Sequence, residues 1–200
     1  MATTVSPAEA LEIIQKYNKE SYHLRHALIV SGVMGDIAKQ LGYSEADCSY
    51  WASVGMLHDI DFELYPENHL ENAPAMLREA GIGEDVIHAV LAHGWGGEWG
   101  VTPEHEMEKV LYAIDELTGL IWAFSRMRPS KSCQDMELSS LQKKYKDKKF
   151  AARCSREVIG RGAELLGWDI DVLLQRTLDA MKACESSVNT QMEKLENATA

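Results

Sequence analysis

Apolar residues recur at helical spacing along almost the whole of this 200-residue chain, and the alternating runs typical of half-buried strands are missing. We therefore predict an all-α fold. Capping signals and glycines predict helices over 8–17 and 22–41, and a capping box at 44–47 opens a third. Hydrophobic residues make up 46% of the chain, which is enough for one core, so we expect a single domain over 1–200.

Later helices are expected near 69–79, 84–93, 104–124, 150–166 and 169–184. The lysine-rich stretch 143–149 is predicted to be a mobile connection. Two readings stay open for the glycine-rich loop 94–100. It is either a lid whose tryptophans stack on a nucleobase or a loop that those tryptophans anchor to the core.

Composition limits the partners of the chain. There are 31 acidic and 20 basic residues, a formal net charge of -11, which argues against general nucleic-acid binding. An anionic substrate would need a local positive centre such as a metal ion. The four cysteines form no closely spaced pair, and neither a secretory leader nor an apolar run of membrane-spanning length is recognisable. We expect a cytoplasmic protein without membrane association; the sequence does not indicate an oligomeric state.

A carboxylate in an apolar helix is the strongest functional signal. Nearly every position from 110 to 124 is apolar, yet Asp115 and Glu116 lie in the middle of this segment. A buried carboxylate without a partner costs several kcal/mol and tends to protonate. Asp115 therefore needs a cation, and a metal ion would be one; the structural alternatives are a buried salt bridge or hydrogen bonds from backbone amides.

Two further segments offer ligands for a metal. His58 and Asp59 follow an apolar segment where the helical pattern breaks up, so both can face one ion near a helix end. His26 shares the apolar face of the second expected helix, where a lone histidine is often only a hydrogen-bonded core residue. Together with Asp115 they form a four-residue set spread over three helices, as metal sites in helical bundles are built.

The order His26, His58-Asp59, Asp115 in a helical chain resembles the HD-domain phosphohydrolase superfamily over about 22–124, with additional C-terminal helices over 130–200. The resemblance implies an HD-like bundle, with these four residues as ligands of one or two divalent ions. Nitrogen and oxygen donors suit manganese, iron, cobalt, nickel or zinc. The His58-Asp59 pair continues as Ile60-Asp61, so the HDIG form of the motif is not matched, and no GYP signature is present. Specificity for cyclic dinucleotides or alarmones is therefore not indicated.

Other histidines have weaker signals. His69 and His93 stand where some HD proteins carry ligands for a second metal or for the substrate phosphate; otherwise His93 is a histidine favoured at a helix C-terminus. We expect His23, His88 and His105 to be structural or solvated.

The activity that this resemblance implies is metal-dependent hydrolysis of a phosphate ester of a small metabolite, such as a nucleotide. His58 and Asp59 would be catalytic, and Asp59 or Asp61 would orient the attacking water. Arg128 and Lys131 are candidate substrate-binding residues, or else cations at a helix end. The alternatives are a non-catalytic HD domain that binds a nucleotide or a protein, and a di-iron protein with oxygen chemistry.

Overall fold

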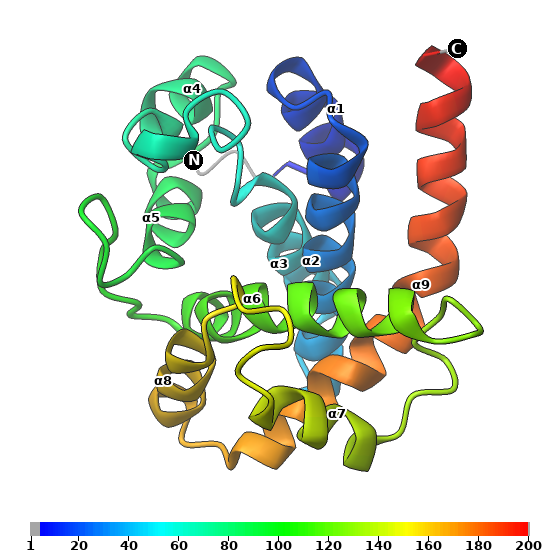
Figure 1. Ribbon diagram of the computed structural model, residues 1–200. Coiled ribbons are helices and arrows are strands. Elements are labelled where there is room, and N and C mark those ends of the chain that lie inside the picture. Colours follow the sequence, from blue (N-terminus) through cyan, green and yellow to red (C-terminus); the bar gives the residue numbers. More distant parts are fainter. Residues whose placement is uncertain (1–4, 200) are drawn as a thin grey trace.

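The computed structural model describes residues 5–199, and these form α-helices without any β-strand (Figure 1). The prediction of an all-α fold is confirmed. The α-helices are α1 (Pro7–Tyr17), α2 (Ser21–Gln40), α3 (Glu45–Leu57), α4 (Ala73–Glu79), α5 (Glu84–Ala92), α6 (Glu106–Met127), α7 (Leu138–Lys146), α8 (Arg156–Leu166) and α9 (Ile170–Thr199), with a 3-10 turn, η1 (Pro66–Asn68). Among them, none combines the length and the apolar character that a membrane span requires.

Local sequence signals set several helix ends. The Ser6 side chain accepts a hydrogen bond from the amide of Glu9 at the start of α1, and Ser44 does the same for Asp47 at the start of α3. Both helices begin with a complete capping box, and the one at Ser44 is the box that the sequence predicted. After α2, Gly42 has a φ of +86°, a left-handed conformation that favours glycine and turns the chain towards α3.

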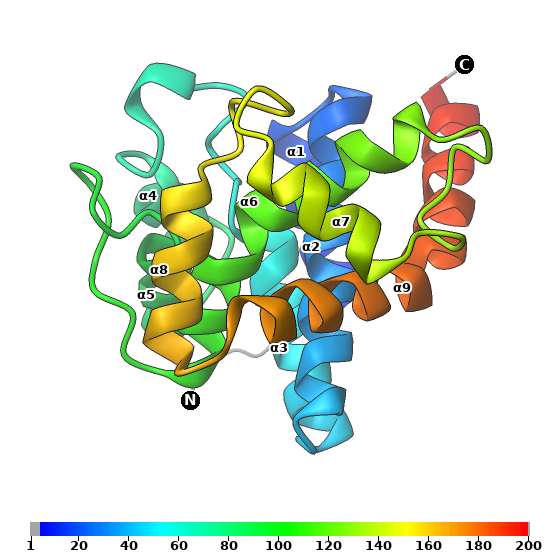
Figure 2. The same cartoon turned by 60° about the horizontal axis from the view of Figure 1, so that its bottom comes forward.

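The helices pack around α2. This helix contacts α3 and α9 most extensively, α6 crosses it, and α8 lies beside α6 in both views (Figures 1 and 2). Fully buried side chains such as Ile37, Leu57, Ile114 and Leu120 belong to one continuous core. The same crossing of α2, α3 and α6 brings the candidate site residues together.

The lysine-rich segment differs from the expectation. Residues 143–146 form the end of α7, which buried Leu141 anchors to the core, and only 147–149 lie in the connection that follows. Arg156 also donates hydrogen bonds to backbone carbonyls of the following loop, including those of Ala151 and Cys154. The last helix continues beyond 184 because Val188 and Met192 extend its buried face.

Candidate metal centre

Six predicted residues converge at one place in the fold, each placed by a helix end or a helix face. His26 comes from α2, His58 caps the end of α3, Asp59 follows it, and Asp115 lies in the middle of α6. The remaining two are His69, which follows η1, and His93, which caps the end of α5. The break in the helix at His58 lets adjacent residues face the same point, as the sequence pattern predicted.

The first group consists of His26, His58 and Asp115. The Nε2 atoms of the two histidines lie 3.1 Å apart, and Asp115 Oδ1 is 3.0 Å from His26 Nε2 and 3.5 Å from His58 Nε2. Asp59 Oδ2 also approaches these nitrogens, at 3.5 Å and 3.2 Å respectively. Four donor atoms therefore surround one point.

The second group consists of His69, His93 and the other oxygen of Asp59. The two Nε2 atoms again lie 3.1 Å apart. Asp59 Oδ1 is 3.3 Å from His69 Nε2 and 3.5 Å from His93 Nε2. Asp59 therefore offers one oxygen to each group and stands between them.

The opposite ring nitrogens indicate which tautomer the neutral histidines would take when they bind a metal. His58 Nδ1 lies 2.8 Å from the carbonyl oxygen of Gly55, and His93 Nδ1 lies 2.5 Å from that of Val90. A carbonyl only accepts, so these Nδ1 atoms carry the proton and donate it, which leaves Nε2 with a lone pair in the neutral ring. Such second hydrogen bonds are typical of metal-binding histidines.

A carboxylate orients the third histidine. His69 Nδ1 donates to Asp61 Oδ1 over 2.8 Å, and Asp61 Oδ2 accepts from the amides of Leu70 and Ala73 at 2.8 Å and 3.1 Å. The Asp61 side chain is completely buried. The expectation that Asp61 orients an attacking water is therefore wrong, because both of its oxygens are already bound within the protein.

The donor set fits divalent metal ions. Two ligands about 2.1 Å from a metal lie about 3.0 Å apart at a right angle and about 3.4 Å apart at a tetrahedral angle. The donor separations of 3.0–3.5 Å in both groups fall in this range. In the second group, the Nδ1 contacts leave both Nε2 atoms with lone pairs in the neutral rings, and facing lone pairs at 3.1 Å repel each other unless a cation lies between them. The sequence prediction that His and Asp residues of this chain can hold a metal is supported by this geometry.

The electrostatics of the group also call for positive charge. Burial by itself would raise the pKa of Asp59, but the charge of His58 and hydrogen bonds from His58 and His93 hold it well below its usual value. Burial likewise opposes ionisation of Asp115, yet hydrogen bonds from His26 and His58 keep its pKa low. Burial would lower the pKa of His58, but Asp59 and Asp115 raise it well above its usual value. Protons and metal ions thus compete for the same place.

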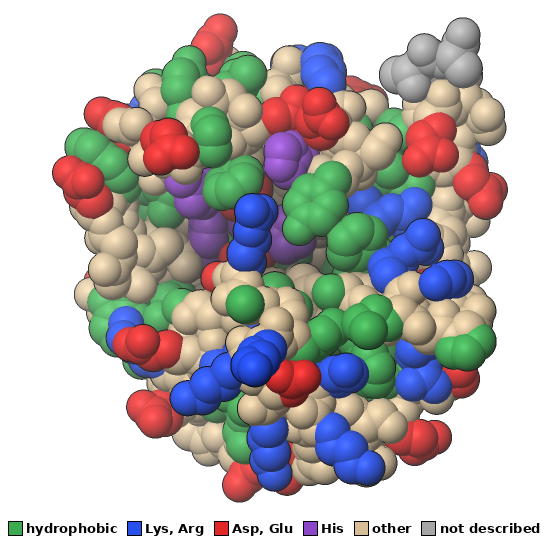
Figure 3. Space-filling view, in the orientation of Figure 1, with side chains coloured by type: hydrophobic (Ala, Val, Ile, Leu, Met, Phe, Trp, Pro, Cys, Tyr) green, Lys and Arg blue, Asp and Glu red, His purple; other side chains and the backbone are tan. Residues whose placement is uncertain are grey.

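The centre opens into a wide cleft of about 910 Å³. Figure 3 shows histidine side chains in a hollow of this face, with cationic and hydrophobic side chains around it. Arg153 and Arg161 line the cleft together with Trp95 and Tyr112. Glu116 lines it too, and burial and the charge of Asp115 raise its pKa to about 7. The cleft has the size of a small-molecule site.

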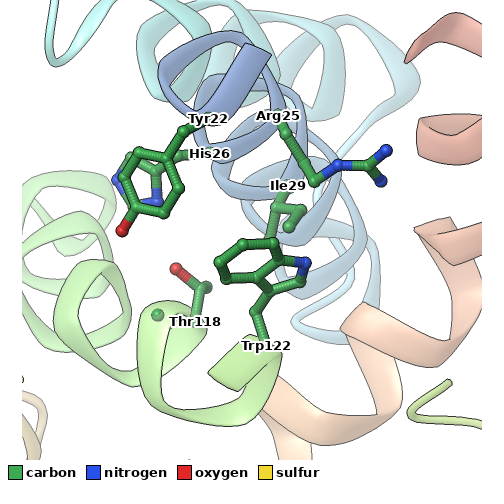
Figure 4. Close-up of a pocket in the computed structure, with 7 residues that line it drawn as sticks. Tyr22, Arg25, His26, Ile29, Thr118 and Trp122 are labelled. Carbon is green, nitrogen blue, oxygen red and sulfur yellow. The ribbon is translucent and has the colours of Figure 1, made fainter. Parts of the chain in front are cut away.

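A much smaller cavity lies behind His26. Its volume is about 10 Å³, enough for about one water molecule. Figure 4 shows Tyr22 and His26 of α2 close together, facing Thr118 and Trp122 of α6. This space is too small for a substrate, so we assign access to the centre to the wide cleft.

The predicted substrate cations are not at the centre. Arg128 Nε pairs with Asp135 Oδ1 at 2.9 Å, and Lys131 Nζ donates to the carbonyl of Arg126 over 2.7 Å. Neither residue lines the cleft. Arg153 and Arg161 occupy that position instead, and the sequence analysis missed them because they belong to no motif and lie far along the chain from Asp115, beyond α7.

The remaining histidines have structural partners. His23 Nδ1 pairs with Glu63 Oε2 and His88 Nδ1 with Glu108 Oε1, each at 2.9 Å. His105 lies at the start of α6, where its amide donates to Glu108 Oε2. The contacts of His88 and His105 agree with the structural or solvated roles that we expected, whereas His23 also lines the cleft.

Comparisons with known proteins add little. No family model matches the chain, and no solved structure matches it significantly. A segment of 115 residues is 29% identical to glycylpeptide N-tetradecanoyltransferase of Schizosaccharomyces pombe. The segment spans 56% of this chain and only 24% of the length of that protein, so the likeness assigns no family.

Proposed function

We propose that the chain is a metal-dependent phosphohydrolase that holds two divalent ions and acts on a phosphate ester of a small metabolite. One observation carries the proposal. Asp59 directs one oxygen to each of two His-containing groups, and the pair of groups lies at the base of a wide cleft. In two-metal phosphatases, a pair of ions about 3.5–4 Å apart binds the attacking and leaving oxygens of a phosphoryl group.

Each residue has a defined task in this proposal. His26, His58 and Asp115 would hold one ion, His69 and His93 the other, and Asp59 both. The ions would lower the pKa of a coordinated water and polarise the phosphoryl group.

The protein contributes positioning and further charge. The carbonyls of Gly55 and Val90 and the buried Asp61 carboxylate fix three imidazole rings, so the donor atoms need little rearrangement. Arg153 and Arg161 supply cations in an otherwise acidic protein, and they would attract an anionic ester into the cleft.

The first test is phosphate release from nucleoside monophosphates and sugar phosphates, with manganese, cobalt, nickel, zinc or magnesium added. Asp59→Asn and Asp115→Asn should reduce turnover at least about 100-fold, because each removes a negative ligand that the proposed metals need. Asp179→Asn is the matched control: it neutralises an exposed carboxylate on α9 and should leave turnover unchanged. Circular dichroism checks that all three variants remain helical.

Turnover that survives Asp59→Asn would refute the proposed role of the centre. If metal-loaded protein hydrolyses none of these esters, the phosphohydrolase proposal fails. The same ligand set, with four histidines and two aspartates, also suits the alternative of a di-iron protein. Oxygen consumption by iron-loaded protein would favour that alternative, and ligand binding without any turnover would favour a binding module.

A further inference from the structure

A second polar group lines the cleft beside the metal centre. Tyr112 lies on α6 one turn before Asp115, and Arg161 lies on α8, which packs against α6. The Arg161 guanidinium carbon is 5.4 Å from the centre of the Trp95 ring, and the Tyr112 ring meets Trp95 edge-on at 5.6 Å. All three side chains line the cleft. None of them is a candidate metal ligand.

The Tyr112 hydroxyl group is buried without a well-formed hydrogen bond. The residue is only 1% exposed, and within the described part of the chain its oxygen forms no hydrogen bond of good geometry. Burial raises the pKa of this phenol, and Arg161 opposes that rise through its charge and through a loose approach of its guanidinium to the hydroxyl. Buried hydroxyl groups are normally paired. An unpaired hydroxyl on the wall of a cleft points to a ligand atom that would complete it.

The Arg161 side chain is held in place, yet its contact with Glu157 uses only part of its hydrogen-bond donors. Its Nη2 pairs with Glu157 Oε1 at 2.8 Å, which uses one of the five N–H groups of the guanidinium. The Trp95 ring supports the planar group through a cation–π contact. Gly96 leaves it room, because a Cβ at that position would lie 3.1 Å from Nη1.

We propose that Arg161 and Tyr112 form a subsite for an anionic group on the leaving part of the substrate. This inference rests on the proposed function. The substrate class is then a phosphate ester whose leaving group carries a carboxylate or a second phosphate. The phosphoryl group lies at the metal centre, and the second anion lies against Arg161. Guanidinium and phenol together bind oxygen anions with charge-assisted hydrogen bonds.

The geometry favours an anion over a nucleobase. Beside Arg161 the aromatic residue is Trp95, which already supports the guanidinium and contacts Tyr112, whereas exposed Tyr22 of the same cleft packs edge-on against His23 and Trp122. Trp99, although 41% exposed, does not line the cleft. One helical turn separates Tyr112 from Asp115, a rise of about 5 Å, so a short leaving group can span the two positions.

Binding of stable phosphonates tests the subsite without any need for turnover. Manganese-loaded protein is titrated calorimetrically with 2-, 3- and 4-carbon phosphonates that end in a carboxylate, in a second phosphonate or in a methyl group. At the best chain length, an anionic end should bind at least about tenfold more tightly than the methyl end. Arg161→Gln should abolish this preference, and Tyr112→Phe should reduce it severalfold.

Arg78→Gln is the matched control, because it also removes a guanidinium paired with a glutamate at an exposed position, and it should keep the full preference. Comparing the affinities of the phosphonates that end in a carboxylate with those that end in a second phosphonate identifies which anion the subsite prefers. Equal affinity for all three ends in the wild type, or a preference that survives Arg161→Gln, would overturn the inference. The inference would also be overturned if a nucleoside phosphonate that lacks a second anion bound more tightly than the best phosphonate with an anionic end. An anion preference without hydrolysis would retain the subsite and refute only the phosphohydrolase.

Discussion

Asp59 is the residue on which the two groups of ligands depend. Its oxygens approach four imidazole nitrogens at 3.2–3.5 Å, two on each side. A single carboxylate in this position makes the two groups parts of one centre. An asparagine there would keep the shape but remove the negative charge and one acceptor, which explains why Asp59→Asn is the critical variant for the proposed activity.

Asp61 is expected to act on the second group alone. Asp61→Asn would weaken the hydrogen bond that orients His69, while His26, His58 and Asp115 keep their contacts. Loss of such an outer partner costs about 10- to 100-fold in metal affinity. We predict this decrease for one of the two ions only, measured by competition with a chromophoric chelator.

An equal decrease in affinity for both ions in Asp61→Asn would contradict the separate role of the second group. The variant also needs a folding control, because Asp61 accepts hydrogen bonds from two backbone amides. A melting curve of the metal-free protein shows whether the effect on metal affinity arises from unfolding.

At the scale of elements, the contact between α6 and α8 sets the position of Arg161 relative to Asp115. Gly162 makes this contact close: a Cβ there would lie 2.5 Å from both the Cα and the Cβ of Ala113. These are backbone and backbone-adjacent atoms, which cannot move aside cheaply. The residue after Arg161 must therefore be small for α8 to lie against the cleft.

Gly162→Ala is predicted to destabilise the protein by about 1–3 kcal/mol through overpacking. Gly160→Ala in the same helix is the control, because its Cβ would find its nearest neighbour, the Tyr145 hydroxyl, at an ordinary 3.8 Å. It should stabilise the protein by about 0.5–1 kcal/mol through helix propensity. Urea unfolding measures both, and equal effects of the two substitutions would contradict the packing argument.

For the whole molecule, local signals predicted much of the fold and tertiary contacts decided the rest. The capping boxes at Ser6 and Ser44 fix helix starts through contacts three residues apart, so the sequence reveals them. Helix α7 is lysine-rich and has only Leu141 fully buried, so periodicity gave no clear signal. Its anchoring by Leu141 and by the loop that Arg156 holds is visible only in three dimensions.

The candidate site, too, could be predicted from the sequence only in part. Burial and spacing pointed to His26, His58, Asp59 and Asp115, because a charged side chain in an apolar helix needs a partner. The resemblance to HD proteins pointed to the other two, His69 and His93. The division of Asp59 between two groups depends on the backbone turn after α3, which no pattern encodes. Arg153 and Arg161 reach the cleft only because α8 packs against α6. Metal binding and hydrolysis themselves stay predictions.

The number of divalent ions bound per chain tests the central claim most directly. The protein is stripped with a chelator, loaded with excess manganese or zinc, separated from free ions by gel filtration, and analysed by inductively coupled plasma mass spectrometry. We predict about two ions per chain in the wild type and a clear loss of bound metal in Asp59→Asn. A wild-type protein that binds no metal, or an Asp59→Asn variant that keeps both ions, would contradict a centre built around Asp59.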